Sequence, residues 1–324
     1  MFDNIILRPL RSPVVLLHAI ISIALLLAIS CSIAFAVGED TRVVILNSDM
    51  SIDGRYMSAQ TSFISGLPSL PADNLKAFDL GKKWFDHSGM ARDIAAFDAD
   101  FIYCIGSDAY KMGLSVPGNH TLIFSSLINW RRLPFGEKTY GIANEVAPGD
   151  QLQIFQELVP QLHTIGILYS SMFNREYVEV AIKAAAERGI RLIPIEIKAK
   201  GESREAIFKN FAQLDALWLI ADPLAISSFQ DIDFIFAQSA LLKKPVFAWQ
   251  GSLIRHGAII TVEPNTAAIG HQAAQIIKKL NAEGKITEKV QAPSKNTITI
   301  NVTRAEELGI RLNTPKISSG FQIH

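Results

Sequence analysis

The sequence has 324 residues, which is enough for two domains of ordinary size or for one unusually large domain. Basic and acidic residues each number 31, so the formal net charge is zero. Proteins that bind a phosphate backbone need a basic surface, and this balance does not indicate one. Nucleic acid is therefore not expected as a partner.

The first 36 residues differ from the rest of the chain. Arg8 and Arg11 precede a long apolar run, which ends at Ala34-Phe35-Ala36 before an acidic stretch. A positive segment, an apolar segment and an A-x-A site are the three parts of a secretory signal peptide. We therefore predict cleavage after Ala36 and export to the periplasm or cell envelope.

Two alternatives for this segment stay open. The residues AISC (28–31) loosely fit a bacterial lipoprotein site, in which Cys31 would carry the lipid. The apolar run 14–37 is also long enough to span a bilayer as an uncleaved anchor. We rank secretion first, lipidation second and the anchor third, because a polar tether usually follows a lipidated cysteine and here an apolar stretch does.

Cleavage would leave a single cysteine, Cys104, inside the apolar stretch FIYCIG. An exported protein with one buried thiol has no disulfide framework and depends on its hydrophobic core. This favours a sizeable α/β protein over a small disulfide-stabilised scaffold.

Short apolar runs alternate with helical patterns in the remaining chain, which is typical of βαβ units and a mostly parallel sheet. In the first half, strands are predicted at 42–48, from 100 to Gly106, and at 120–126, and the region 49–98 indicates one or two helices. A turn-rich segment, 128–150, then separates two groups of strands. The chain is therefore predicted to form two doubly wound halves whose strand ends face a cleft.

The second half alternates more regularly. Apolar residues recur on one face of 149–160, which predicts a helix closed by Pro160. The elements that follow are predicted as strands at 164–171, 190–197, 216–222, 245–249 and 257–263, helices at 175–189, 203–214, 227–243 and 265–284, and a final strand and short helix within 297–312.

Sequence motifs of catalysis are missing. No G-x-S-x-G elbow precedes a helix, no G-x-x-x-x-G-K-[ST] loop is present, and no G-x-G-x-x-G follows the first strand. The seven histidines form no H-x-x-x-H or H-x-H pair. We therefore expect no enzymatic activity, no metal and no cofactor.

Polar groups follow the ends of the predicted strands, and ligands of open parallel sheets collect outside these carboxyl ends. The candidate ligand residues are Asn47, Ser107, Asp108, Ser126, Ser170, Ser171, Asp222, Trp249 and Asn265. Serine, aspartate and asparagine are also the preferred N-caps of helices, so capping is an equal alternative for Ser107 and Ser126. Trp249 fits either stacking on an aromatic ligand or packing.

Asp222 is the leading candidate. Pro223 would fit the first turn of a helix that Asp222 caps, but the helical pattern resumes only near Ser227. A loop therefore separates the acid from the helix, and its carboxylate could pair with an ammonium group of a ligand. This favours a ligand contact over a cap.

The second half of the chain resembles the periplasmic substrate-binding proteins of ABC transporters, in the branch with tryptophan- and tyrosine-type binders. The resemblance covers about 141–313 well and 42–130 less well. It is carried by the order and spacing of IGILYSS, AAAERGIRLIPIEI, LDALWLIADP, KKPVFAWQGSLIRHGAIITVEPNTAAIGHQAAQIIKKLNAEG and INVTRAEELGIRL, with FIYCIGSDAY and TLIFSSLIN in the first half.

The resemblance implies an α/β, type I binding-protein fold: two Rossmann-like lobes with parallel sheets, joined by three crossing segments. The implied lobes are 37–143 plus 264–287 and 144–263 plus 288–324, with crossings near 141–146, 261–265 and 284–291. It also implies ligand contacts in three loops. These are Ser107 and Asp108, Asp222, and Ser170, Ser171 and Asn174.

The sequence departs from the family pattern at the site. Relatives commonly carry threonine-aspartate-asparagine where this chain has Ala221-Asp222-Pro223, and aspartate-tyrosine where it has Pro264-Asn265. The implied function is a monomeric, exported solute-binding protein that delivers a small polar, amino-acid-like ligand to the transmembrane subunits of an ABC permease. A ligand-sensing domain for a signalling partner is the first alternative, and an α/β hydrolase or transferase the second.

Overall fold

The computed structural model describes residue 38 and residues 40–50, 55–81, 87–313, 315 and 321–324. The predicted signal peptide, the alternative lipoprotein site at Cys31 and the alternative anchor lie outside these residues. Within the described part of the chain, no helix is both long and apolar enough to cross a membrane.

The first lobe is built on a six-stranded parallel sheet in the order β11-β5-β4-β3-β1-β2. Its strands are β1 (Val43–Asn47), β2 (Leu75–Asp79), β3 (Phe101–Ile105), β4 (Thr121–Ser125), β5 (Thr139–Ile142) and β11 (Val290–Gln291). Three of them coincide with predicted strands. β2 was not predicted because it is a half-exposed edge strand, whose sequence LKAFD lacks a continuous apolar run.

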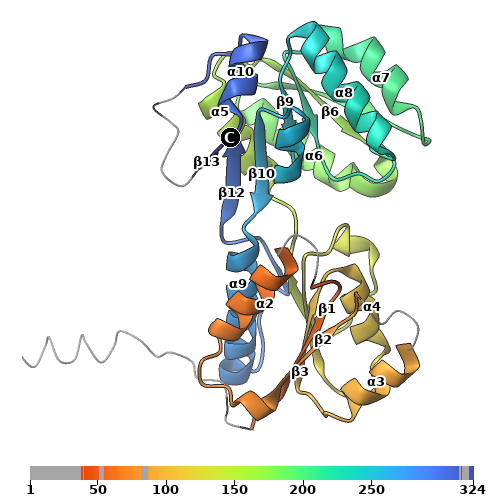
Figure 1. The fold of residues 1–324 in the computed structure, drawn as a ribbon, viewed down its shortest axis with the longest axis vertical. Helices are drawn as coiled ribbons and strands as arrows, with labels where there is room; N and C mark the ends of the chain where they lie inside the picture. Colours follow the sequence, from red (N-terminus) through yellow and green to blue (C-terminus); the bar gives the residue numbers. More distant parts are fainter. Residues whose placement is uncertain (1–37, 39, 51–54, 82–86, 314, 316–320) are drawn as a thin grey trace, which may run out of the picture. The chain divides into compact units, whose positions relative to one another are not determined.

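Helices cover both faces of this sheet (Figure 1). Val43 and Ile45 pack with α2 (Arg55–Ser65) and α9 (Thr266–Glu283) on one face. The alternate residues of β1 pack on the other face with α3 (His87–Ala95) and α4 (Ser107–Ser115). Burial on both sides explains why β1 is apolar throughout.

The helix α9 belongs to the first lobe although it follows most of the second lobe in sequence. At Gly270 a Cβ atom would lie 2.0 Å from the carbonyl oxygen of Ala59 in α2, so only glycine permits this close approach. β11 then pairs with β5. The first lobe therefore includes Val290–Gln291, and the predicted return to the second lobe at residue 288 is too early, because this short, half-buried strand carries no apolar signal.

The second lobe has a seven-stranded sheet in the order β13-β12-β10-β9-β8-β6-β7, parallel except for the β10–β12 pair. Its strands are β6 (Thr164–Tyr169), β7 (Arg191–Glu196), β8 (Ala216–Leu219), β9 (Val246–Ala248), β10 (Ile260–Pro264), β12 (Asn296–Ile300) and β13 (Gln322–Ile323). β13 was not predicted, because two exposed residues give no strand pattern.

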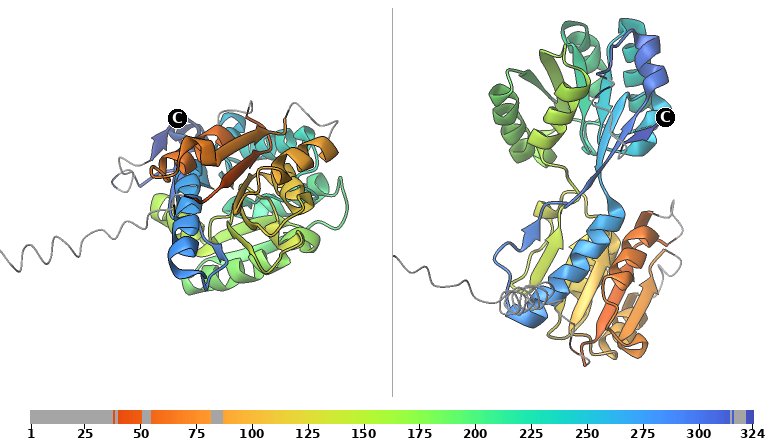
Figure 2. Two further views of the ribbon diagram at one scale, coloured as in Figure 1. Left: turned by 90° about the horizontal axis from the view of Figure 1, so that it is seen from below. Right: turned by 90° about the vertical axis from the view of Figure 1, so that its left-hand side faces the viewer.

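Helices also cover both faces of this second sheet (Figure 2). One face packs with α5 (Pro148–Leu158), α6 (Ser171–Glu187) and α10 (Val302–Leu308), and the other with α7 (Ser203–Asn210) and α8 (Phe229–Leu242). Short 3-10 helices complete the chain: η1 (Ala72–Asn74), η2 (Trp130–Arg132), η3 (Phe211–Gln213) and η4 (Gly251–His256).

Three connections join the two sheets. They lie between β5 and α5, between β10 and α9, and between β11 and β12. The predicted α/β architecture of two lobes with parallel sheets is thus confirmed.

Candidate ligand-binding site

A cavity opens where strands of the second sheet end and two of the connections pass. About 80 Å³ of it can be occupied by the centre of a water-sized sphere, and the whole hollow, open solvent included, measures about 780 Å³. Ligands of open α/β sheets collect at such carboxyl ends. The polar and aromatic residues that line it are Asn129, Asn144, Glu145, Gln151, Asn174, Tyr177, Trp249, Gln250, Glu263 and Thr266.

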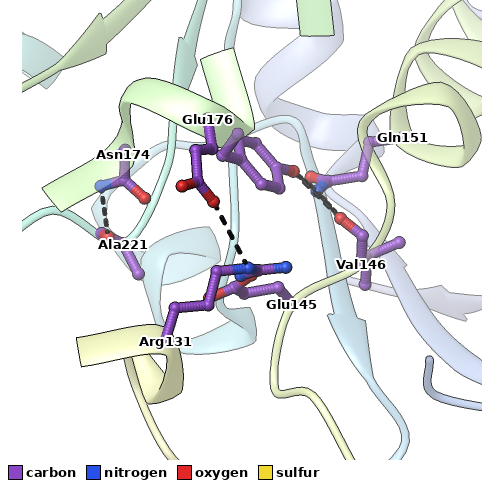
Figure 3. Close-up of polar contacts among 8 residues, drawn as sticks. Arg131, Glu145, Val146, Gln151, Asn174, Glu176 and Ala221 are labelled. Atoms are coloured by element: carbon purple, nitrogen blue, oxygen red, sulfur yellow. Dashed lines mark hydrogen bonds and ion pairs between the residues drawn. The ribbon is translucent and has the colours of Figure 1, made fainter. Parts of the chain in front are cut away.

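Tyr177 and Gln151 share one backbone acceptor, the carbonyl oxygen of Val146, at the wall of the cavity. Gln151 and Val146 are labelled in Figure 3. The Tyr177 hydroxyl donates to the Val146 carbonyl oxygen at 3.0 Å. Gln151 Nε2 donates to the same oxygen at 3.1 Å and to the Tyr177 hydroxyl at 2.6 Å. Burial, reinforced by the negative charge of Glu145, raises the pKa of Tyr177 well above its usual value, so the hydroxyl keeps its proton.

The amide of Gln151 has a defined orientation. A carbonyl oxygen only accepts hydrogen bonds, so the nitrogen of the amide faces Val146 and the oxygen faces away. Oε1 has no hydrogen-bond partner among the described residues, although the side chain is only 3% exposed. A buried acceptor left unpaired costs free energy, which a ligand that donates a hydrogen bond would recover.

Asn174 reaches the cavity from the start of α6, where it interrupts the helical backbone with a ψ of 20°. Its Nδ2 donates to the carbonyl oxygen of Ala221 at 3.1 Å and to Asp222 Oδ2 at 2.8 Å. Both amide hydrogens are therefore used within the protein. The part of Asn174 left for a ligand is its Oδ1 acceptor.

Asp222 is buried, and five donor groups of the protein surround its carboxylate. Ser170 donates from its backbone nitrogen at 2.6 Å and from its hydroxyl. Asn174 donates from its side chain, and Leu224 and Ala225 donate their backbone N–H groups at 3.0 and 2.9 Å. Asp222 lies beneath the cavity wall, outside its lining, and holds the loops that carry Asn174.

An ion pair connects the first lobe to the cavity. Arg131 in η2 contacts Glu145 at 2.6 Å and Glu176 in α6 at 3.9 Å (Figure 3). Its guanidinium also lies over the ring of Trp130, 4.7 Å from the centroid. Glu145, one of two carboxylates in the cavity lining, is therefore matched by a cation just outside it.

The remaining predicted residues of the second half lie close to the cavity. Trp249 lines it directly, at the end of β9. Asn265 caps α9: its Oδ1 accepts from Ala268 N at 2.9 Å, and its Nδ2 donates to Thr297. Ser171 begins α6 and lines a neighbouring cavity.

The predicted residues of the first half do not line this cavity. Asn47 is fully buried and donates to Gln60 at 3.0 Å. Ser107 and Asp108 begin α4, where Asp108 pairs with Lys111 at 3.6 Å. Ser126 is buried with a left-handed φ of 60°. Within the described part of the chain, no group of three or more His, Cys, Asp or Glu side chains could hold a metal ion.

The model of the ABC transporter substrate binding protein family matches residues 91–321. The chain belongs to this family. Members bind a substrate without catalysing a reaction, and they are typically extracytoplasmic. No curated protein sequence matches the chain.

Solved structures share the fold of this binding protein. A ligand-free, open substrate-binding protein with adhesive properties from Clostridium difficile has 15% identity and a TM-score of 0.69, covering 88% of this chain and 99% of its own. A conserved domain protein from Vibrio cholerae has 18% identity and a TM-score of 0.60, with coverages of 88% and 100%. An ABC domain from Streptococcus pneumoniae, in complex with L-Trp, has 19% identity and a TM-score of 0.59, with coverages of 87% and 100%.

Sequence reasoning missed several cavity residues of this binding protein, above all Gln151 and Tyr177. Gln151 carries a signal that was available: it lies four residues before Phe155 and seven before Leu158, on the buried face of α5. A glutamine within an apolar stripe needs polar partners. Tyr177 gives no such signal, because a tyrosine on a helix face fits ordinary packing.

Proposed function

We propose that this ABC substrate-binding protein takes a small polar ligand into the cavity lined by Gln151, Asn174 and Trp249, and delivers it to the transmembrane subunits of a permease. The observation that carries the proposal is the unpaired Oε1 of Gln151, 3% exposed in the wall of a cavity at the strand ends. A few placed polar groups beside an aromatic side chain are typical of small-molecule sites.

The position of the cavity supports a coupling between binding and hinge motion. Asn144, Glu145 and Val146 belong to one connection between the sheets, and Pro264 and Thr266 flank another. A ligand that contacts these segments has different affinities for different hinge angles, so it shifts the population toward the arrangement that it favours.

Thermal-shift screening against amino acids and other small metabolites tests the proposal. A ligand present at a hundred times its Kd adds about 2.7 kcal/mol to the free energy of unfolding and raises the melting temperature. We expect Trp249→Ala to abolish the shift. Phe208→Ala, which removes an aromatic side chain 73% exposed on α7 and outside the cavity, should preserve it.

Two results would contradict the proposal. One is the absence of a shift with every compound of the screen. The other is a ligand whose shift is undiminished in the Trp249→Ala variant, since that ligand would bind elsewhere.

A further inference from the structure

We propose that the ligand extends from the cavity lined by Trp249 into a second cavity beside it, where Arg132 and Arg175 hold an oxyanion group of the ligand, a carboxylate or a phosphate. The inference rests on the proposed function, because it adds a ligand group and its binding residues to the same site. It concerns the end of the ligand that lies away from Trp249.

The second cavity adjoins the first and offers more room. The centre of a water-sized sphere can occupy about 440 Å³ of it, against about 80 Å³ of the first. The two cavities share four lining residues, which are Asn129, Glu145, Asn174 and Tyr177. Most of the space that a ligand can fill at this site therefore lies in the second cavity.

Both lobes contribute to the second cavity. Its lining includes Arg131 and Arg132 from η2 of the first lobe, and Ser171, Phe173 and Arg175 from the first turns of α6 in the second lobe. Arg132 already contacts the opposite lobe, since its guanidinium lies 4.9 Å from the centroid of the Phe173 ring. A ligand group bound here would touch both lobes, so it would favour one hinge angle over others.

The charges of the second cavity leave two cations without a carboxylate. Its lining has three arginines and two glutamates, and Arg131 lies close to both glutamates, 2.6 Å from Glu145 and 3.9 Å from Glu176 (Figure 3). The side chains of Arg132 and Arg175 form no ion pair and no hydrogen bond with any residue that the structure describes. Two guanidinium groups are therefore available to an anion.

The hydrogen-bonding groups of the lining suit an oxyanion. A guanidinium has five N–H donors and no acceptor, in a planar fork that matches a carboxylate or a phosphate. Stacking of Arg132 on Phe173 uses the face of this group and leaves its N–H donors for a ligand. The hydroxyl of Ser171 and the amide of Asn129, which form no hydrogen bond within the described part of the chain, can each add a donor.

The two glutamates are the features that oppose an anion in this cavity. Glu145 is 22% exposed and is neutralised by its ion pair with Arg131. Glu176 is 81% exposed, so water and salt screen its charge. The exposed side chains of Arg132 and Arg175 are screened in the same way, and their attraction for an anion should therefore weaken as the ionic strength rises.

Calorimetric titration with matched probes tests the oxyanion group. Phenylacetate, phenethyl alcohol and phenethylamine share one frame and carry an anion, a neutral hydroxyl and a cation, and benzyl phosphate replaces the carboxylate by a phosphate. We expect the tighter of the two anions to bind at least about tenfold more tightly than the alcohol and the amine. The same comparison distinguishes a carboxylate from a phosphate. Added sodium chloride should weaken the anions and leave the alcohol unchanged.

Variants connect the affinity to the named arginines. Arg175→Gln and Arg132→Gln should each weaken the tighter anion about fivefold or more and leave the alcohol unchanged. Arg175→Gln is the cleaner variant, because Arg132→Gln also removes the contact with Phe173. The matched control is Arg191→Gln, which removes the same charge from the exposed start of the edge strand β7, outside both cavities, and should leave every affinity unchanged.

The outcomes separate the two proposals. If the tightest ligand among these probes and the screened metabolites carries no oxyanion, the inference is overturned and the proposed function stands. If no compound binds at all, both fall. An anionic ligand whose affinity is the same in Arg132→Gln, Arg175→Gln and the unaltered protein also overturns the inference, because its oxyanion would then be bound elsewhere.

Discussion

Replacing Asp222 tests whether its carboxylate organises the loops or contacts the ligand. In Asp222→Ala, five donor groups lose their acceptor, and three of them are backbone N–H groups, of Ser170, Leu224 and Ala225, which cannot turn toward another partner. A buried donor left without an acceptor costs about 1–3 kcal/mol. Water that enters the vacated space recovers part of this, so we expect a loss of about 3–5 kcal/mol in the free energy of unfolding.

Asp222→Asn is the more informative variant because it keeps the volume of the side chain. Each oxygen of Asp222 accepts from at least two donors, so an amide nitrogen in either position faces N–H or O–H groups. We expect a loss of about 2–3 kcal/mol. Urea unfolding should show a lower midpoint with an unchanged slope.

Asp215→Asn is the matched control. Asp215 is exposed, and its Oδ2 accepts from His163 N and Thr164 N at 3.0 and 2.8 Å. Water can replace this acceptor, so about 1 kcal/mol or less should be lost. The reasoning is refuted if Asp222→Asn unfolds at the midpoint of the unaltered protein yet no longer binds the ligand, because the carboxylate would then be a direct contact, as the sequence suggested.

Three further predictions concern other parts of the chain. Gly270→Ala should destabilise the protein by about 2 kcal/mol or more in thermal unfolding, because the new Cβ would lie 2.0 Å from a carbonyl oxygen of α2. The control is Gly149→Ala, which should be neutral or stabilising because no atom lies closer than 3.7 Å to its new Cβ. Equal effects of the two substitutions would contradict the close contact between α2 and α9. Burial raises the pKa of both Tyr103 and Tyr177, so the folded state keeps protons that the unfolded state loses near pH 10. Burial also raises the pKa of the Cys104 thiol, which in the unfolded chain titrates near pH 9, so stability should begin to fall there. Above pH 10 it should fall by about a further 1.4 kcal/mol per pH unit for each tyrosine, and a flat profile in urea unfolding from pH 9 to 11 would count against it. Mass spectrometry of the exported protein should find cleavage after Ala36, and an intact or lipid-modified N-terminus would support one of the alternatives instead.

The fold followed from the sequence wherever strands are buried on both faces. β1, β3 and β8 are fully buried, and each gives a short, continuous apolar run that predicts a strand directly. β2 and β11 are half-exposed strands at the two edges of the first sheet, and neither is continuously apolar. These two segments are strands because they pair with β1 and β5, and this pairing cannot be predicted from their own short sequences.

For the candidate cavity, the sequence indicated the strand ends of the second sheet but only some of the lining residues. Strand ends located the cavity, and Trp249 and Asn174 do line it. Asp222 stands at a strand end as well, but a strand-end acid can point to a ligand or to nearby N–H groups, and the folded chain supplies five donors. Gln151 was not predicted because it lies within the helix α5, whereas the candidate residues were taken from the ends of predicted strands.

The return of α9 and β11 to the first lobe has a consequence for how the chain is made. Synthesis runs from the N-terminus, so the face of the first sheet that α9 covers, including Val43 and Ile45, stays uncovered until most of the second lobe has been produced. The first lobe is therefore complete only when β11 has been made, after most of the second lobe, and apolar surface exposed in the meantime favours aggregation. The second sheet cannot be completed until β12 has been synthesised, and β12 follows β11 in the sequence. A cell that makes this protein therefore has to keep a nearly complete chain from aggregating until its C-terminal segment arrives.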